Sequence, residues 1–474
     1  MISSSVWSSV EKVVMEAVSF LVFLVLARLL QPTDYGILAI AMVFVTLLGN
    51  IAGLGISGAV IQIRELLPTH LSGGFWSTLL VAAFMYAIVY SCAPYLASFY
   101  KEPALEYVLL CLGFIGVLNA LESVPRALLS RHFKFRFLAL RSFCSTLVGG
   151  VVGITMAFNG YGVWALVAQQ LSSTLVRTLL TWVGAGWVPT FRVSWEPLKA
   201  LLSVGLYIMG TRLSNTFSRQ TDNFLIGTFL GSRELGVYSI GVKVSRTANS
   251  VLLHSLSRLG LPTFSRLQGS ADQLENAYQR VWTMGAALTL PVFILVMLTA
   301  SDLVPLLFGD QWQDSATVLQ ILMIASCCLA LNNFDSPLLV ACGKAKLAFR
   351  LAIARTLLNV IGFAVAVNWG INAVAAAFAI AGLMMLPVWK VAIEKYSPVS
   401  VKNASGQLIS VAYGLVGLSV SVLLLGYLLS DIPNLYLIAS QWILGLIGYS
   451  AIVFARDQSL RSGMRDLLNL GFGK

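Results

Sequence analysis

The chain has 474 residues, of which 58% are hydrophobic and only 11% are charged, and its mean hydropathy is +0.83. Because soluble domains contain about 25% charged residues, this composition excludes an ordinary soluble protein and predicts a polytopic membrane protein. The formal net charge of +11 reflects basic residues that gather in alternate loops, and it gives no support to nucleic-acid binding.

Apolar segments long enough to cross a bilayer as helices follow one another along the whole chain. We expect fourteen spans, at 7–30, 37–62, 72–99, 104–129, 138–158, 162–184, 199–228, 236–260, 279–307, 314–341, 347–367, 371–393, 406–429 and 433–455. The first span has no basic region before it and no small-residue cleavage site behind it, so we expect it to be retained. The predicted fold class is an all-α polytopic membrane protein.

Basic residues set the expected orientation. They occupy alternate loops and the C-terminal tail, as Arg64, Arg131, Lys134, Arg136, Arg192, Lys199, Arg266, Arg280, Lys344, Lys346, Arg350, Lys395, Lys402, Arg456, Arg461, Arg465 and Lys474. The opposite loops hold little more than Arg28, Lys101 and Arg233. The positive-inside rule therefore predicts that the basic loops and both termini are cytoplasmic.

The cysteines and histidines predict no site chemistry. Six cysteines lie in or at the ends of spans without CxxC or Cys/His spacing, and we interpret them as packing residues. The three histidines are scattered along the chain. We expect no metal site and no cofactor.

The two halves of the chain repeat each other. LLQPTDYGILAIA at 29–41 aligns with FLGSRELGVYSIG at 229–241, an offset of 200. Later landmarks keep offsets of 210 to 212, and they pair Pro94 with Pro305, Pro125 with Pro337 and Gly160 with Gly370. Six spans separate the copies, so both halves enter the membrane in the same sense and are related by a pseudo-twofold along its normal.

This repeat predicts the domain organisation. We expect an N-terminal lobe at 1–185, a second six-helix lobe at 186–395, and two further spans with a cytoplasmic tail at 396–474. The lobes would face each other around a central cavity. Pro125 and Pro337 would either let their spans bend as a lobe rocks or serve as static kinks.

Two consecutive spans carry polar stripes at helical spacing. The first, within RLSNTFSRQTDN at 212–223, consists of Arg212, Asn215, Arg219 and Asp222. The second contains Lys243 and Arg246. In the first span, Lys12 occupies the position that the repeat makes equivalent to Arg212, with Glu16 nearby.

These cations are costly inside a membrane. A basic residue at a helix centre costs about 2.5–3.5 kcal/mol on the lenient insertion scale, so four approach ~10 kcal/mol. The cost favours a hydrated cavity that binds an anion, while an inter-helix salt-bridge network or snorkelling toward the helix ends is the alternative. A pyrophosphate matches several guanidinium groups, and a gap between two lobes suits a lipid tail. The predicted substrate is therefore a lipid-linked phosphate.

A family resemblance adds to this interpretation. The segment SRQTDNFLIGTFLGSRELGVYSIGVKVSRTANSVLLHSLSRLGLPTFSRLQ at 218–268 resembles the middle of polysaccharide-unit flippases of the Wzx and colanic-acid-exporter type. ARLLQPTDYGILAIA at 27–41 resembles their first periplasmic turn. These proteins belong to the multidrug, oligosaccharidyl-lipid and polysaccharide (MOP) exporter superfamily, and the resemblance in layout extends over essentially the whole chain.

The resemblance implies export of an undecaprenyl-pyrophosphate-linked oligosaccharide repeat, from the cytoplasmic to the periplasmic leaflet, for capsule, exopolysaccharide or O-antigen synthesis. It assigns the pyrophosphate to Arg212, Arg219, Lys243, Arg246 and, as a further candidate, Lys12. Candidate sugar contacts are Asn215, Asn332 and Asn333, although asparagines in apolar helices often bond between helices instead. Candidate ion-coupling carboxylates are Asp222, Glu122, Asp335 and Glu16. Export driven by the membrane potential alone is the other option.

Two other functions compete with this one. A cation-coupled multidrug or small-molecule exporter of the same superfamily would be expected to display membrane carboxylates rather than a cationic stripe. A membrane polymerase or ligase of the same pathway would need a long periplasmic loop and a catalytic constellation, and the sequence predicts neither. We therefore expect a monomeric bacterial inner-membrane flippase that is not an enzyme. Its expected partners are the lipid-linked oligosaccharide, the bilayer and the polysaccharide polymerase machinery.

Overall fold

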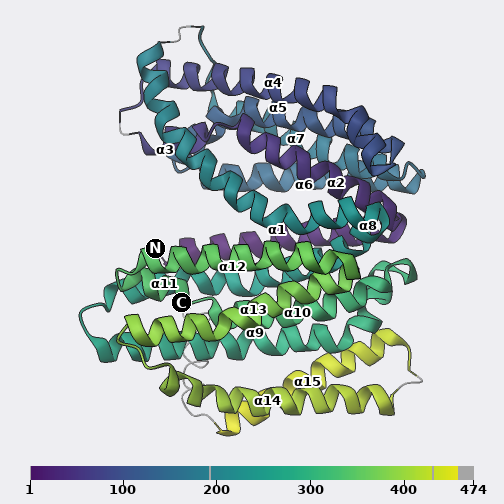
Figure 1. Cartoon of the computed structure of the whole chain (residues 1–474), viewed down its shortest axis with the longest axis vertical. Helices are drawn as coiled ribbons and strands as arrows, with labels where there is room; N and C mark the ends of the chain where they lie inside the picture. The colour runs from purple at the N-terminus through teal and green to yellow at the C-terminus, as the bar shows by residue number, and fades with distance from the viewer. Residues whose placement is uncertain (1, 64, 192–193, 430–431, 457–474) are drawn as a thin grey trace. The chain divides into compact units, whose positions relative to one another are not determined.

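The computed structural model describes the backbone of residues 2–63, 65–191, 194–429 and 432–456, and the side chains of these residues except 2–13, 254–259, 402–405 and 407. Helices account for nearly all of this part of the chain (Figure 1). They are α1 Ile2–Leu29, α2 Pro32–Ala52, α3 Ile56–Gln62, α4 Pro68–Tyr100, α5 Pro103–Arg131, α6 Phe135–Phe158, α7 Val163–Ala185, α8 Trp195–Arg266, α9 Ala271–Phe308, α10 Asp314–Asn332, α11 Asp335–Ala341, α12 Ala345–Ala366, α13 Ile371–Tyr396, α14 Val401–Leu428 and α15 Asn434–Arg456, with short 3-10 turns at Asp310–Trp312 and Val367–Trp369.

The helices follow the predicted spans. Within the described residues, ten helices are long and apolar enough to cross a membrane by length and composition. The expected span at 37–62 is divided into α2 and α3, and the one at 314–341 into α10 and α11. The all-α membrane fold is thus confirmed, while the count of fourteen spans stays a prediction.

Proline and capping residues explain where several helices begin. Pro32, Pro68 and Pro103 occupy the first positions of α2, α4 and α5, where the missing N–H costs nothing and the fixed φ suits a helix. At α2, the Asp34 carboxylate also accepts the backbone N–H of Gln31 at 3.0 Å. This closes the first turn of α2 at the start of the repeated segment.

The chain forms two compact units, Met1–Ser239 (unit 1) and Ile240–Lys474 (unit 2). In unit 1, α7 packs against both α5 and α6, and α4 packs along α5. In unit 2, α10 packs between α9 and α13, and α14 and α15 pack against each other and against α9. The division between the units falls inside α8, and the lobe boundaries expected from the repeat stay a prediction.

A break divides α8 at Gly231, whose φ of 87° and ψ of −178° are not helical. This conformation is essentially restricted to glycine because a side chain would clash with the backbone. Gly231 lies 200 residues after Gln31, the residue that caps the start of α2. The helices are therefore interrupted at equivalent places in both halves of the repeat, although Gln31 is extended, with φ of −91°, and Gly231 has a positive φ.

Gly231→Ala should lower stability by about 1–3 kcal/mol through backbone strain alone, because a β-carbon there would meet no atom within 4 Å. Gly210→Ala is the matched control, since Gly210 lies in the helical part of α8 and its added β-carbon would also meet nothing within 4 Å. There alanine should be neutral or stabilising by up to ~1 kcal/mol. Thermal unfolding of the purified variants in detergent measures the stability of each. Equal unfolding temperatures for the two variants would contradict backbone strain at Gly231.

The two equivalent turns also touch each other inside unit 1. A β-carbon at Gly36 would overlap the backbone carbonyl of Ser232, and one at Gly236 would overlap the backbone carbonyl of Pro32. Gly36 and Gly236 are 200 residues apart, as are Pro32 and Ser232. The contact is therefore reciprocal under the offset of the repeat, which supports a pseudo-twofold relation between these turns.

Candidate functional site

The polar stretch at 212–223, in the N-terminal part of α8, is accessible. Arg212, Asn215 and Arg219 have exposed side chains, and within the described residues no side chain or backbone group pairs with Arg212. The neighbouring Thr216 accepts a hydrogen bond from Asn50 of α2 at 2.8 Å. Unit 1 thus has two exposed arginines on α8. The hydrogen bond between Asn50 and Thr216, which carries no charge, joins this part of α8 to α2.

Asp222 lies on the same stretch but is only 8% exposed. Its carboxylate accepts the Tyr238 hydroxyl at 3.2 Å and the backbone N–H of Asn223 at 2.8 Å. Tyr238 follows the break at Gly231, so this hydrogen bond joins the two parts of α8 within unit 1. The expected pairing of Asp222 with Arg219, and its alternative role in ion coupling, stay predictions.

The remaining candidate cations lie elsewhere in the chain. Lys243 is half-buried and Arg246 exposed, and both belong to unit 2, whereas Arg212 and Arg219 belong to unit 1. The side chain of Lys12 lies outside the described residues. Convergence of these cations on one pyrophosphate therefore stays a prediction.

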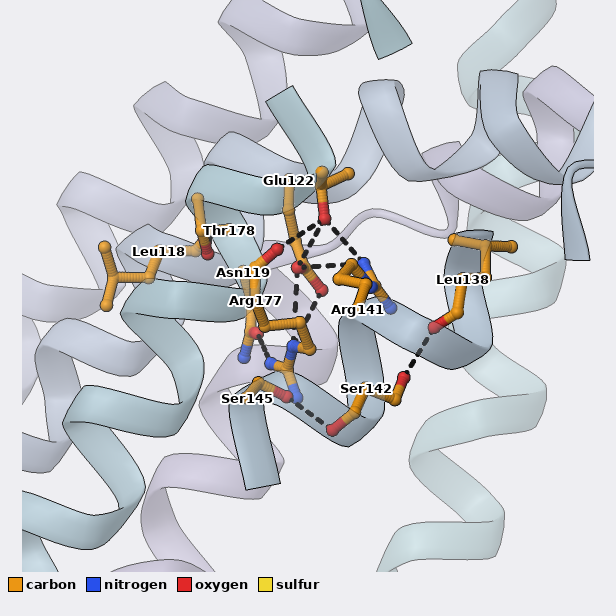
Figure 2. Close-up of polar contacts among 10 residues, drawn as sticks. Leu118, Asn119, Glu122, Leu138, Arg141, Ser142, Ser145, Arg177 and Thr178 are labelled. Carbon is orange, nitrogen blue, oxygen red and sulfur yellow. Dashed lines mark hydrogen bonds and ion pairs between the residues drawn. The ribbon is translucent and has the colours of Figure 1, made fainter. Parts of the chain in front are cut away.

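A buried charge cluster lies between α5, α6 and α7 of unit 1 (Figure 2). Glu122 of α5 is 2% exposed, and its carboxylate meets Arg141 of α6 at 3.4 Å and Arg177 of α7 at 3.3 Å. Arg141 also donates to the Thr181 hydroxyl at 2.6 Å, and Arg177 to the Asn119 side-chain oxygen at 2.7 Å. Two guanidinium groups face one carboxylate, so these three side chains together carry a formal charge of +1.

Unit 2 contains a related pair. Asp335, at the start of α11, is fully buried, and both of its carboxylate oxygens accept bonds from Lys390 of α13, at 2.8 and 2.9 Å. Glu122 and Asp335 are 213 residues apart, and so are Arg177 and Lys390. The repeat therefore places an acid and a base, 55 residues apart, in each unit.

The candidate sugar-binding asparagines flank this pair. Asn332 ends α10, and Asn333 follows it before α11 begins. Both side-chain polar atoms of Asn332 are buried and have no partner among the described residues. The contacts of Asn215, Asn332 and Asn333 with sugar stay predictions.

Glu16 of α1, the remaining candidate for ion coupling, is half-buried, and that role also stays a prediction.

Sequence reasoning missed Arg141, Arg177 and Lys390. Each is a single basic residue inside an otherwise apolar span, whereas the predicted site consists of stripes of several polar residues. A lone cation in a membrane segment is itself a signal, because it must find a partner or water. The equal spacing of acid and base in the two halves was the second signal available.

The chain belongs to a known family. A family model described as "Polysaccharide biosynthesis protein" matches residues 25–317, more than half of the chain. The succinoglycan biosynthesis transport protein ExoT of Rhizobium meliloti (strain 1021) is 28% identical over 350 residues, which cover 74% of this chain and 71% of ExoT. The lipopolysaccharide biosynthesis protein WzxC of Escherichia coli (strain K12) is 20% identical over 359 residues, covering 75% of this chain and 73% of WzxC.

Solved structures show the same fold. The lipid II flippase MurJ, in an inward closed conformation, superposes with a TM-score of 0.75 at 14% identity, covering 96% of this chain and 99% of that one. An inward-facing multidrug resistance MATE transporter of the MOP superfamily superposes with a TM-score of 0.61 at 16% identity, covering 79% and 92%. The resemblance to polysaccharide exporters is confirmed, and the chain is a membrane transporter of polysaccharide biosynthesis rather than an enzyme.

Proposed function

We propose that the chain is a flippase that moves an undecaprenyl-pyrophosphate-linked oligosaccharide repeat from the cytoplasmic to the periplasmic leaflet. The observation that carries this proposal is Arg212, an exposed cation on a span-length helix that no described residue pairs with. Such a cation costs about 2.5–3.5 kcal/mol in hydrocarbon. Water and an anionic headgroup in a cavity remove that cost.

The substrate class follows from this charge and from the family. Exposed Arg212 and Arg219 offer planar guanidinium groups that bind phosphate oxygens in a bidentate manner. The relatives named above serve succinoglycan and lipopolysaccharide biosynthesis, and one of the solved structures with the same fold is a lipid II flippase. We assign the pyrophosphate to Arg212, Arg219, Lys243, Arg246 and Lys12, and the sugars to Asn215, Asn332 and Asn333.

The proposed mechanism is alternating access without covalent chemistry. The headgroup enters a cavity that is open to the cytoplasm, the two lobes rock, and the cavity opens to the periplasm while the lipid tail stays in the bilayer. Moving two negative charges outward along an inside-negative potential releases about 4.6 kcal/mol per 100 mV. In this scheme a monomer, with both termini in the cytoplasm of a bacterial inner membrane, passes its product to the polysaccharide polymerase.

The rival function is export of cationic drugs. Such a substrate would need a free membrane carboxylate. Glu122 already faces two guanidinium groups, and Asp335 is bonded through both oxygens to Lys390. The described carboxylates of the two pairs therefore favour the anionic substrate.

The triple substitution Arg212→Ala, Arg219→Ala, Arg246→Ala tests the proposal. Three lost charge-assisted hydrogen bonds, at about 1.5–3 kcal/mol each, predict export at least ~1000-fold slower. Lipid-linked repeat units should accumulate on the cytoplasmic face, measured by their accessibility in right-side-out and inverted vesicles.

The matched control removes the same charge from exposed positions near helix ends, as Arg136→Ala, Lys346→Ala, Arg350→Ala. It should export at the wild-type rate. Normal export by a well-expressed Arg212, Arg219, Arg246 variant would overturn the assignment and favour a structural salt-bridge network.

A further inference from the structure

The ammonium group of Lys390 lies inside a cage of oxygen atoms in unit 2. Its nitrogen is 2.8 Å and 2.9 Å from the two carboxylate oxygens of Asp335, 3.0 Å from the backbone carbonyl of Leu331 and 3.1 Å from the Tyr278 hydroxyl. The face of the Trp282 ring covers the same nitrogen, with the ring centroid 4.5 Å away. Four oxygens thus surround a group that has only three protons to donate.

An interruption of the helix supplies part of this cage. α10 ends at Asn332 and α11 begins at Asp335, so the N–H of Asp335 does not continue the helical ladder to the Leu331 carbonyl, and Pro337 has no N–H to donate to the carbonyl of Asn333. The Leu331 carbonyl accepts side-chain donors instead, the Lys390 ammonium and the Trp282 indole N–H at 2.7 Å. A carboxylate beside a carbonyl from interrupted helix is the arrangement with which membrane proteins coordinate small cations.

The cage lies in an apolar core. Asp335 and Tyr278 are 0% exposed, and Trp282 is 4% exposed. Phe334 and Leu338 belong to the same hydrophobic cluster. An unpaired, charged carboxylate in this position would be strongly destabilised, and the Lys390 nitrogen supplies the cation that offsets its charge.

The equivalent pair in unit 1 has no such cage. There α5 continues as a helix through Pro125, and Arg177 shares Glu122 with Arg141 while bonding the side-chain oxygen of Asn119. A planar guanidinium bound by side-chain acceptors does not resemble a spherical ion. The oxygen cage around Lys390 in unit 2 therefore has no counterpart around Arg177 in unit 1, and duplication of the chain does not by itself explain it.

We propose that Asp335, Tyr278 and the Leu331 carbonyl form a monovalent-cation site whose cation is the chain's own Lys390 ammonium. The tethered ammonium stands where a free sodium ion would otherwise bind. Unit 2 consequently keeps its buried carboxylate neutralised at any external sodium concentration. While Lys390 is in place, Asp335 carries no exchangeable ion, an inference that does not depend on the identity of the transported substrate.

Lys390→Ala tests this by removing the ammonium and leaving the oxygens. We expect wild-type protein in detergent to unfold at the same temperature in sodium chloride and in N-methyl-D-glucamine chloride of equal ionic strength. The variant should unfold at a lower temperature in N-methyl-D-glucamine chloride and regain stability saturably with sodium. Binding of radioactive sodium should rise by about one ion per chain relative to wild type.

Two further variants separate this proposal from a simple ion pair. Asp335→Asn, Lys390→Ala lacks the charge that holds the cation, so its sodium effect should disappear. Lys395→Ala removes an exposed lysine from the same helix and should behave as wild type. The proposal fails if sodium does not raise the unfolding temperature of Lys390→Ala above its value in N-methyl-D-glucamine chloride. It also fails if sodium raises the unfolding temperature of the wild type by as much.

Folding failure is also informative. Recovery of folded Lys390→Ala only when sodium is present throughout purification would support the proposal. Failure to fold in either salt, while Asp335→Asn, Lys390→Ala folds in both, would overturn it, because the buried, uncompensated carboxylate would then be a destabilising charge that sodium cannot neutralise.

Discussion

Gly36→Ala and Gly236→Ala are each expected to destabilise the protein by more than about 3 kcal/mol, the upper end of the usual range for overpacking. Each added β-carbon would overlap a backbone carbonyl, that of Ser232 or that of Pro32, rather than a flexible side chain. A backbone carbonyl cannot rotate away, so the two turns must separate. The unfolding temperature in detergent and the rate of polymer export should both decrease.

Gly116→Ala is the matched control for this prediction, because Gly116 is a helical glycine of α5 whose added β-carbon would meet no atom within 4 Å. It should be neutral or stabilising by up to ~1 kcal/mol. The double variant Gly36→Ala, Gly236→Ala should cost much less than the sum of its parts, since both substitutions disrupt one reciprocal contact. Additive costs, or a Gly36→Ala variant as stable as Gly116→Ala, would contradict the contact.

Glu122→Gln is expected to cost about 3–5 kcal/mol, the range for removing one partner of a buried ion pair. The substitution keeps the shape of the side chain but leaves the guanidinium groups of Arg141 and Arg177 without their carboxylate. Arg141 is only 5% exposed, so water cannot replace the lost charge. The unfolding temperature of the purified protein reports the effect.

Glu106→Gln on the same helix is the control, because Glu106 lies in the first turn of α5 and is half-exposed. Its effect should be within about 0.5 kcal/mol. Adding Arg141→Gln to Glu122→Gln should restore part of the lost stability, because it removes the buried charge that Glu122 neutralises. A Glu122→Gln variant with wild-type stability would show that the cluster is hydrated and contributes little to stability.

Local features of the sequence determined much of the fold. The composition and the apolar periodicity predict a helical membrane protein, and the helices of the structure lie over the predicted spans, although the spans at 37–62 and 314–341 are each divided into two helices. The alignment of 29–41 with 229–241 anticipates that α8 is interrupted at Gly231 as the chain is interrupted before α2. These properties depend on a few neighbouring residues, because a span needs only length, apolar side chains and a residue that ends it.

The pairing of buried charges was decided by the tertiary structure alone. Glu122 and Asp335 were predicted as ion-coupling candidates, but only packing shows that Arg177 and Lys390, each 55 residues later, lie against them. The same holds for Gly36, whose lack of a side chain matters because the backbone of Ser232 lies against it. The physical reason is that insertion into a membrane depends on the hydropathy of each helix separately. The partner of a buried charge, or of a glycine backbone, depends instead on which face of a distant helix packs against it.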